Sequence, residues 1–134
     1  MKKIYLDVDG VLLTSWHAQA VPGAVDLIDY VTNNFDCYWL TSYCRGDARS
    51  VLKMLSKYYD KATLSKMQSI KATQWRNQKT DAIDFESDFY WLDDCPSFSA
   101  QHELKMYNRL DRLIVVDLNR EDELKRVIEL LKKI

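Results

Sequence analysis

Short apolar runs of strand length recur along this chain and alternate with segments of helical periodicity. The runs are residues 3–8, 37–40, 62–64, 89–92 and 113–116. Residues 23–34, a segment beginning at Asp47 and residues 121–133 place apolar side chains at helical spacing. Strands that are apolar along their length and alternate with helices are typical of a parallel sheet covered on both faces. We therefore predict a single α/β domain over 1–134, a Rossmann-like three-layer sandwich with a five-stranded, mainly parallel sheet.

The composition agrees with one domain and excludes several classes of function. The 134 residues are 47% hydrophobic and 29% charged, which is enough for a sizeable core. The net charge of −1 does not favour a polycation that wraps nucleic acid or anionic lipid. The three glycines, Gly10, Gly23 and Gly46, form neither a dinucleotide-binding fingerprint nor a phosphate-binding loop.

The sequence also predicts a cytoplasmic protein that does not span a membrane. Asp7 interrupts the apolar residues at the start before they reach the length of a signal peptide, and no run approaches the ~20 residues of a membrane span. The three cysteines, Cys37, Cys44 and Cys95, include no CxxC pair. A disulfide framework or structural zinc site is therefore not expected.

Polar side chains follow several of the predicted strands. Asp7, Thr41, Asp93 and Asp117 each stand where an apolar run ends. Ligands of open parallel sheets bind beyond the carboxyl ends of the strands. We therefore expect the residues near positions 7, 41 and 93 to meet in one crevice.

The strongest chemical signal is a group of four carboxylates, Asp7, Asp9, Asp93 and Asp94. Gly10 allows a sharp turn directly after the first two. Two like charges ~4 Å apart repel by about 4 kcal/mol at an effective dielectric constant of ~20. Such a cluster binds a cation or holds a proton, and oxygen ligands favour Mg²⁺.

Four motifs, in their order and strand context, resemble those of the haloacid dehalogenase-like (HAD) phosphatase superfamily over nearly the whole chain. The matching residues are Asp7-Val8-Asp9-Gly10-Val11, Cys37-Tyr38-Trp39-Leu40-Thr41, Lys79 and Trp91-Leu92-Asp93-Asp94. Lys71 is the second choice for the lysine. The resemblance implies a magnesium-dependent phosphatase that acts on phosphate monoesters.

The resemblance also implies a role for each residue. Asp7 would attack phosphorus and form an aspartyl-phosphate, and Asp9 would act first as general acid and then as general base. Thr41 would donate a hydrogen bond to a phosphoryl oxygen, and Lys79 would offset negative charge. The Mg²⁺ ligands would be Asp7, the backbone carbonyl of Asp9, Asp93 and Asp94. A carboxylate at position 9 favours a phosphatase or phosphomutase over a dehalogenase.

The spacing of the motifs leaves no room for a cap domain. Thirty-one residues separate Asp9 from Thr41, and fourteen separate Leu64 from Lys79. The resemblance thus implies an open site, as in uncapped relatives that often act on bulky phosphates. We predict that Gly10, Ser42 and Arg45 contact the substrate.

Two alternatives stay open. The first is a nucleotide or polynucleotide-end phosphatase, because residues 61–80 carry five basic side chains and no acidic side chain. Aromatic and basic residues that could stack a base are also expected near the crevice: Trp16, His17, Tyr43, Arg45, Trp75 and Arg76. The second is a catalytically silent module that binds phosphate or magnesium. A receiver module is disfavoured, because its acidic pair comes on the first strand.

Overall fold

The structure is a computed structural model that describes all residues, 1–134. Its sheet has four parallel strands in the order β2-β1-β3-β4. The strands are β1 (Lys3–Leu6), β2 (Asp36–Trp39), β3 (Phe89–Asp93) and β4 (Leu113–Val115). The helices are α1 (Ala24–Asn34), α2 (Arg49–Leu55), α3 (Lys61–Met67), α4 (Phe98–Met106) and α5 (Glu123–Lys132). Two short 3-10 turns, η1 (Lys79–Ala82) and η2 (Leu110–Arg112), complete the fold.

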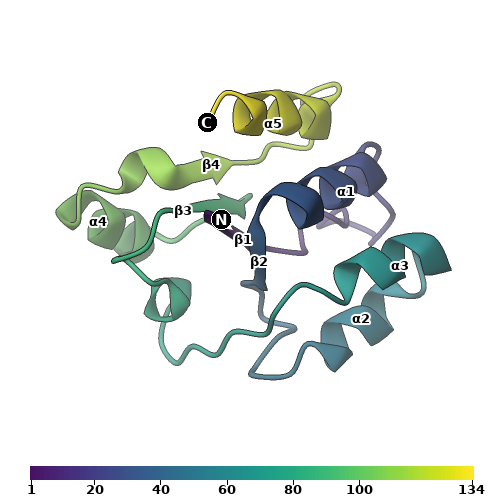
Figure 1. Cartoon of the computed structure of the whole chain (residues 1–134), viewed down its shortest axis with the longest axis horizontal. Helices are drawn as coiled ribbons and strands as arrows, with labels where there is room; N and C mark the ends of the chain where they lie inside the picture. The colour runs from purple at the N-terminus through teal and green to yellow at the C-terminus, as the bar shows by residue number, and fades with distance from the viewer.

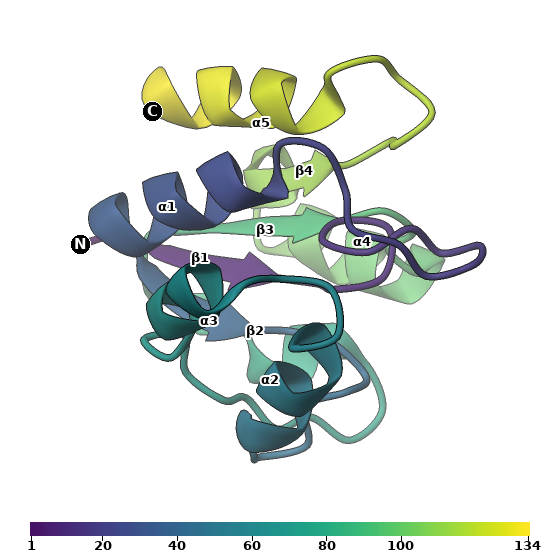
Figure 2. The same cartoon turned by 90° about the vertical axis from the view of Figure 1, so that its right-hand side faces the viewer.

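Helices cover both faces of the sheet because alternate strand residues bury against opposite layers. Ile4 and Leu6 of β1 belong to a large core cluster that includes residues of α1, α2, α3 and α5. Tyr5, between them, belongs to a smaller cluster with Trp91 and with Leu104 of α4. Figures 1 and 2 show α1 and α5 together on one side of the sheet and α4 on the other. The α/β class and the parallel sheet are therefore confirmed.

The prediction of five strands was wrong. Residues 62–64 lie inside helix α3, where Asp60 caps the first turn by accepting a hydrogen bond from the Thr63 amide. A short extended segment borders β2 instead, since Lys71 pairs with Tyr38 as an isolated parallel bridge. The Trp39 amide donates to the Lys71 carbonyl at 2.8 Å. Beside β2 the structure thus has one isolated bridge, and the sheet has four strands.

Helix α4 was not predicted from the sequence. Only Ala100 and Leu104 of this helix are buried, while Phe98 and Met106 are 92% and 73% exposed. Its apolar residues therefore do not form one continuous stripe at helical spacing. The hydroxyl of Ser97 caps the helix by accepting from the Ala100 amide at 3.1 Å. No helix of the chain has the length and apolar character required to span a membrane.

The central position of β1 sets up the functional site. β1 pairs with β2 on one side and with β3 on the other. The Leu40 amide donates to Leu6 O at 2.7 Å, and the Asp7 amide donates to Leu92 O at 3.1 Å. These bonds continue the pairing to the ends of the strands, so the segments that carry Asp7, Thr41 and Asp93 leave the sheet side by side.

Candidate metal and phosphate site

Three carboxylates meet at the carboxyl edge of the sheet. Asp7, Asp93 and Asp94 each offer an oxygen, and these atoms lie within 4.8 Å of one another. Asp7 and Asp93 are 6% and 1% exposed, while Asp94 is partly buried. The sheet thus brings together three of the four carboxylates that the sequence singled out.

Lys79 is the only lysine paired with this cluster. Its Nζ atom lies 3.0 Å from Asp7 Oδ2 and 2.7 Å from Asp93 Oδ2. The side chain of the alternative lysine, Lys71, extends to the amino end of β2, where its Nζ atom pairs with Asp36 at 2.9 Å. The geometry therefore separates the two candidates and places Lys79 between two buried carboxylates.

The buried cluster carries an excess of negative charge. Burial, and then the charge of Asp93, raise the pKa of Asp7 to about 7 against the lowering effect of Lys79. Burial and Asp93 also raise the pKa of Asp94. Burial lowers the pKa of Lys79, but Asp7 and Asp93 outweigh it and the pKa stays above its ordinary value. One lysine thus does not neutralise three carboxylates.

Both oxygens of Asp93 have donors. Oδ2 accepts from Lys79, and Oδ1 accepts from the Cys95 amide at 2.9 Å. Asp7 is oriented in a similar way, because its Oδ1 accepts from the Val8 amide at 2.8 Å. These bonds hold the two side chains in fixed directions, as a site that must receive a ligand without rearrangement requires.

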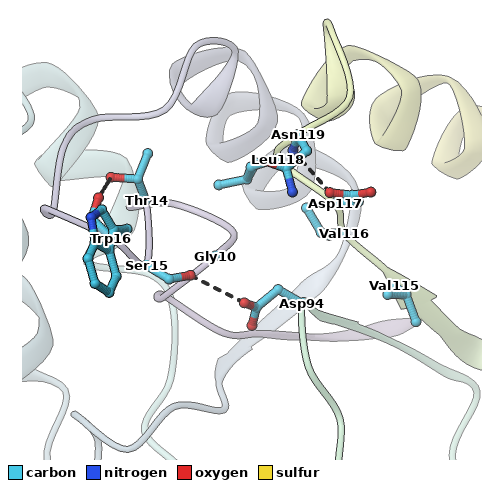
Figure 3. A pocket seen from close by; sticks show the side chains of 10 residues that line it. All are labelled: Gly10, Thr14, Ser15, Trp16, Asp94, Val115, Val116, Asp117, Leu118 and Asn119. Carbon is cyan, nitrogen blue, oxygen red and sulfur yellow. Dashed lines mark hydrogen bonds between the residues drawn. The ribbon is translucent and has the colours of Figure 1, made fainter.

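Gly10 permits the close approach of Asp94. A Cβ atom at position 10 would lie 2.1 Å from the Asp94 carboxyl group, and the backbone of Gly10 has a φ of +77°. Both observations require glycine. Ser15, in the loop after β1, donates its hydroxyl hydrogen to Asp94 Oδ2 at 3.4 Å, as Figure 3 shows.

Two cavities flank the carboxylate cluster. One, of about 590 Å³, lies beside Asp94 and Gly10 and is shown in Figure 3. It is bordered by Trp16, which is 82% exposed, and by Asp117. The other, of about 420 Å³, is lined by residues that include Lys79, Asp93 and Trp91. Asp94 thus borders the first cavity and Asp93 the second, while Asp7 lines neither.

The remaining predicted site residues have different surroundings. Thr41 is 1% exposed and lies two residues after the end of β2, and its hydroxyl accepts from the Tyr43 amide at 3.4 Å. The carboxylate of Asp9 accepts from the Tyr43 hydroxyl and is not part of the three-carboxylate cluster. Ser42 is exposed. The Arg45 guanidinium stacks 4.0 Å from the Trp75 ring centroid and donates to the Trp75 carbonyl, so its predicted substrate contact stays a prediction.

Sequence reasoning missed the residue that anchors the segment carrying Lys79. Glu103 of α4 accepts from Gln78 Nε2 and from the Thr80 hydroxyl, both at 2.7 Å. These bonds clamp η1 onto α4 on either side of Lys79. No sequence signal pointed to Glu103, because helix α4 itself was not predicted.

A scan of the chain against models of known protein families finds no match, and a search among curated proteins finds no significant relative.

Proposed function

We propose that this protein is a magnesium-dependent phosphatase of the HAD type, which hydrolyses phosphate monoesters through an aspartyl-phosphate on Asp7. The observation that carries the proposal is the cluster of Asp7, Asp93 and Asp94 at one sheet edge, with Lys79 bonded to two of them. The resemblance of the motifs to those of HAD phosphatases points to the same chemistry.

The donor set fits Mg²⁺. Carboxylate oxygens are hard ligands, and a divalent cation would offset the burial and the charge of Asp93, which together raise the pKa of Asp7. Asp7, Asp93, Asp94 and the backbone carbonyl of Asp9 are the candidate ligands. When bound, the ion would stabilise negative charge on the phosphoryl group.

Asp7 is suited to nucleophilic attack. Lys79 holds its Oδ2 and Val8 holds its Oδ1, so the carboxylate is oriented before the substrate arrives. Lys79 would also offset the charge of the phosphate, and the Thr41 hydroxyl would donate to a phosphoryl oxygen. Asp7 and Thr41 come from segments that continue strands of the sheet, and Lys79 comes from η1, which Glu103 of α4 holds.

Asp9 is suited to proton transfer. Its side chain lies outside the metal cluster, which leaves the carboxyl group free to exchange a proton. It would protonate the leaving oxygen while Asp7 attacks, and then take a proton from the water that hydrolyses the aspartyl-phosphate.

The substrate class is phosphate monoesters in general. The basic residues of 61–80 do not form one wall, since Lys66 pairs with Asp29 at 2.8 Å and Lys71 pairs with Asp36. This dispersal does not favour recognition of a polynucleotide. The open cavities beside the carboxylates leave room for substrates of several sizes.

The test is hydrolysis of an aryl phosphate with Mg²⁺, by wild type and by Asp7→Asn. We expect turnover that a chelator abolishes, and a loss of about 10⁴-fold or more in kcat for the variant, as when a nucleophile is removed. Asp36→Asn, at the amino ends of the strands, is the matched control and should retain activity. Equal activity of Asp7→Asn and wild type would refute the nucleophile, and Mg²⁺ binding without any hydrolysis would favour a silent binding module.

A further inference from the structure

The hydroxyl of Tyr43 holds the side chain of Asp9. Tyr43 Oη lies 3.2 Å from Asp9 Oδ1 and 3.1 Å from Asp9 Oδ2. Asp9 follows β1 and Tyr43 follows β2, so the contact links two adjacent strand ends across 34 positions of sequence. It is the only side-chain hydrogen bond made by the Asp9 carboxylate in the structure.

Tyr43 is itself held in place by its surroundings. Its amide donates to the Thr41 hydroxyl at 3.4 Å, and its carbonyl accepts from the Ser50 hydroxyl at 2.7 Å. The next residue, Cys44, is fully buried and its amide donates to Thr41 O at 3.1 Å. The backbone of the loop after β2 is therefore held at Tyr43, and from there the side chain reaches Asp9.

The contact lies on the open side of the site. Tyr43 is 39% exposed and Asp9 is partly buried, whereas Asp7 and Asp93 are almost fully buried. A phosphate ester attacked by Asp7 has its leaving group on the side away from Asp7, because attacking and leaving oxygens are roughly in line. The leaving group is thus directed toward the more exposed part of the site.

We propose that Tyr43 is a positioning residue, which fixes the Asp9 carboxyl group for proton transfer to the leaving oxygen. The inference rests on the proposed function. An Asp7 oxygen forms a bond to phosphorus while the bond from phosphorus to the leaving oxygen breaks and its electron pair goes to that oxygen. The leaving oxygen takes the proton of the Asp9 carboxyl group, which yields a free alcohol, an aspartyl-phosphate and an Asp9 carboxylate.

The two oxygens of the Asp9 carboxyl group take different roles in the proposed step. A protonated carboxyl group has one O–H and one carbonyl oxygen. Tyr43 Oη lies almost equally far from the two oxygens of Asp9, so in the proposed step its O–H donates to whichever oxygen is the carbonyl and leaves the Asp9 O–H available to the substrate. In the second step, Asp9 takes a proton from water as the water oxygen bonds to phosphorus, and the bond from phosphorus to Asp7 breaks to release phosphate.

The dependence on the leaving group separates this role from a structural one. An alkoxide is a poor leaving group and requires protonation, while p-nitrophenolate leaves without help. The kcat/KM value reports the steps through formation of the aspartyl-phosphate. Loss of the Tyr43 hydroxyl should therefore affect alkyl phosphates far more than p-nitrophenyl phosphate.

The experiment compares kcat/KM of wild type and Tyr43→Phe for ethyl phosphate and p-nitrophenyl phosphate, with saturating Mg²⁺. We expect a loss of about 10- to 100-fold for the alkyl ester, part of the 10²–10⁴-fold that general acid catalysis supplies, and a loss below about 3-fold for the aryl ester. In an Asp9→Asn background, the same change should cause no further loss. Tyr30→Phe, on α1 where the ring packs against Phe35, is the matched control.

The outcomes separate the two proposals. Equal losses for both esters, or a further loss in the Asp9→Asn background, would overturn the role of Tyr43 and leave the phosphatase intact. A wild type that hydrolyses neither ester would overturn the phosphatase and the role of Tyr43 with it. Circular dichroism and thermal melting of Tyr43→Phe show whether the fold is preserved, and Tyr43→Leu, which also lacks the hydroxyl, repeats the comparison if Phe is not tolerated.

Discussion

The two edges of the sheet carry the same residue types, aspartate and lysine, in opposite arrangements. At the amino edge, Lys3 pairs with Asp84 at 3.2 Å and Lys71 pairs with Asp36 at 2.9 Å. The side chains of these pairs are 26–60% exposed. In each of these two pairs one positive charge faces one negative partner, and water screens both.

At the carboxyl edge, one lysine serves several carboxylates. Lys79 contacts Asp7 and Asp93, whose side chains are 8% and 2% exposed, and Asp94 lies close by. Surface pairs contribute roughly 0–1 kcal/mol, whereas removing one partner from a buried group costs about 3–5 kcal/mol. The number of ion pairs therefore does not reveal the site. Burial and unbalanced charge do.

The largest difference between the edges should appear in activity. Lys79→Met removes the positive charge beside Asp7 and the phosphate, and should lower kcat/KM by about 10²–10³-fold, as for removal of a donor that stabilises the transition state. Lys71→Met, which breaks the pair with Asp36 at the other edge, should change kcat/KM by less than about twofold.

Steady-state kinetics with Mg²⁺ and an aryl phosphate measure both lysine variants, after circular dichroism has established that each is folded. Comparable losses in Lys79→Met and Lys71→Met would mean that the two edges do not differ in function. A large effect of Lys71→Met alone would move the site to the amino edge.

Much of this contrast could be predicted from the sequence. Asp7, Thr41 and Asp93 each end an apolar run, and a parallel sheet brings such ends to one edge. Because β1 pairs with both β2 and β3, the three positions became neighbours as expected. The order of the motifs along the chain was sufficient to predict that these three positions are neighbours, because the pairing rules of parallel sheets bring successive strand ends together.

The rest depends on contacts that local patterns do not encode. The choice between Lys79 and Lys71 rests on where η1 docks, which Glu103 of the unpredicted helix α4 determines through hydrogen bonds to neighbours of Lys79. The apolar character of residues 62–64 suits either a strand or a short helix. The Asp60 side chain caps the first turn at this point, which favours the helix. Tyr43 was expected near the crevice, but its bond to Asp9 follows from the path of one loop.

The second difference between the edges should appear in stability without metal. Burial and Asp93 raise the pKa of Asp7 to about 7, from 3.8 in an unfolded chain. Folding therefore favours the protonated form, so this contribution to stability is complete below about pH 4 and is lost as the pH rises through 7. The free energy of unfolding of wild type, relative to Asp7→Asn, should fall between pH 4 and pH 8 by up to about 4 kcal/mol.

Urea unfolding in EDTA at several pH values, for wild type and Asp7→Asn, measures this change. Added Mg²⁺ should restore the stability of wild type at pH 8 more than that of the variant, because binding to the folded state alone stabilises it. A difference between the two proteins that does not vary with pH would show that Asp7 is ionised in the metal-free fold over the whole range.

The smallest effect should come from Asp36, and its dependence on pH should have the opposite sign. Burial raises the pKa of this carboxyl group, but hydrogen bonds from Lys71 and Tyr38 outweigh burial and lower the pKa below its ordinary value of 3.8. Asp36 therefore stabilises the fold above about pH 4, and this contribution is lost as the pH falls through its folded pKa. Asp36→Asn should cost less than about 1 kcal/mol at pH 7, by urea unfolding, and the cost should vanish toward pH 2. A cost that instead grew on acidification would show that Asp36 behaves like the buried carboxylates at the other edge, and the contrast between the two edges would no longer hold.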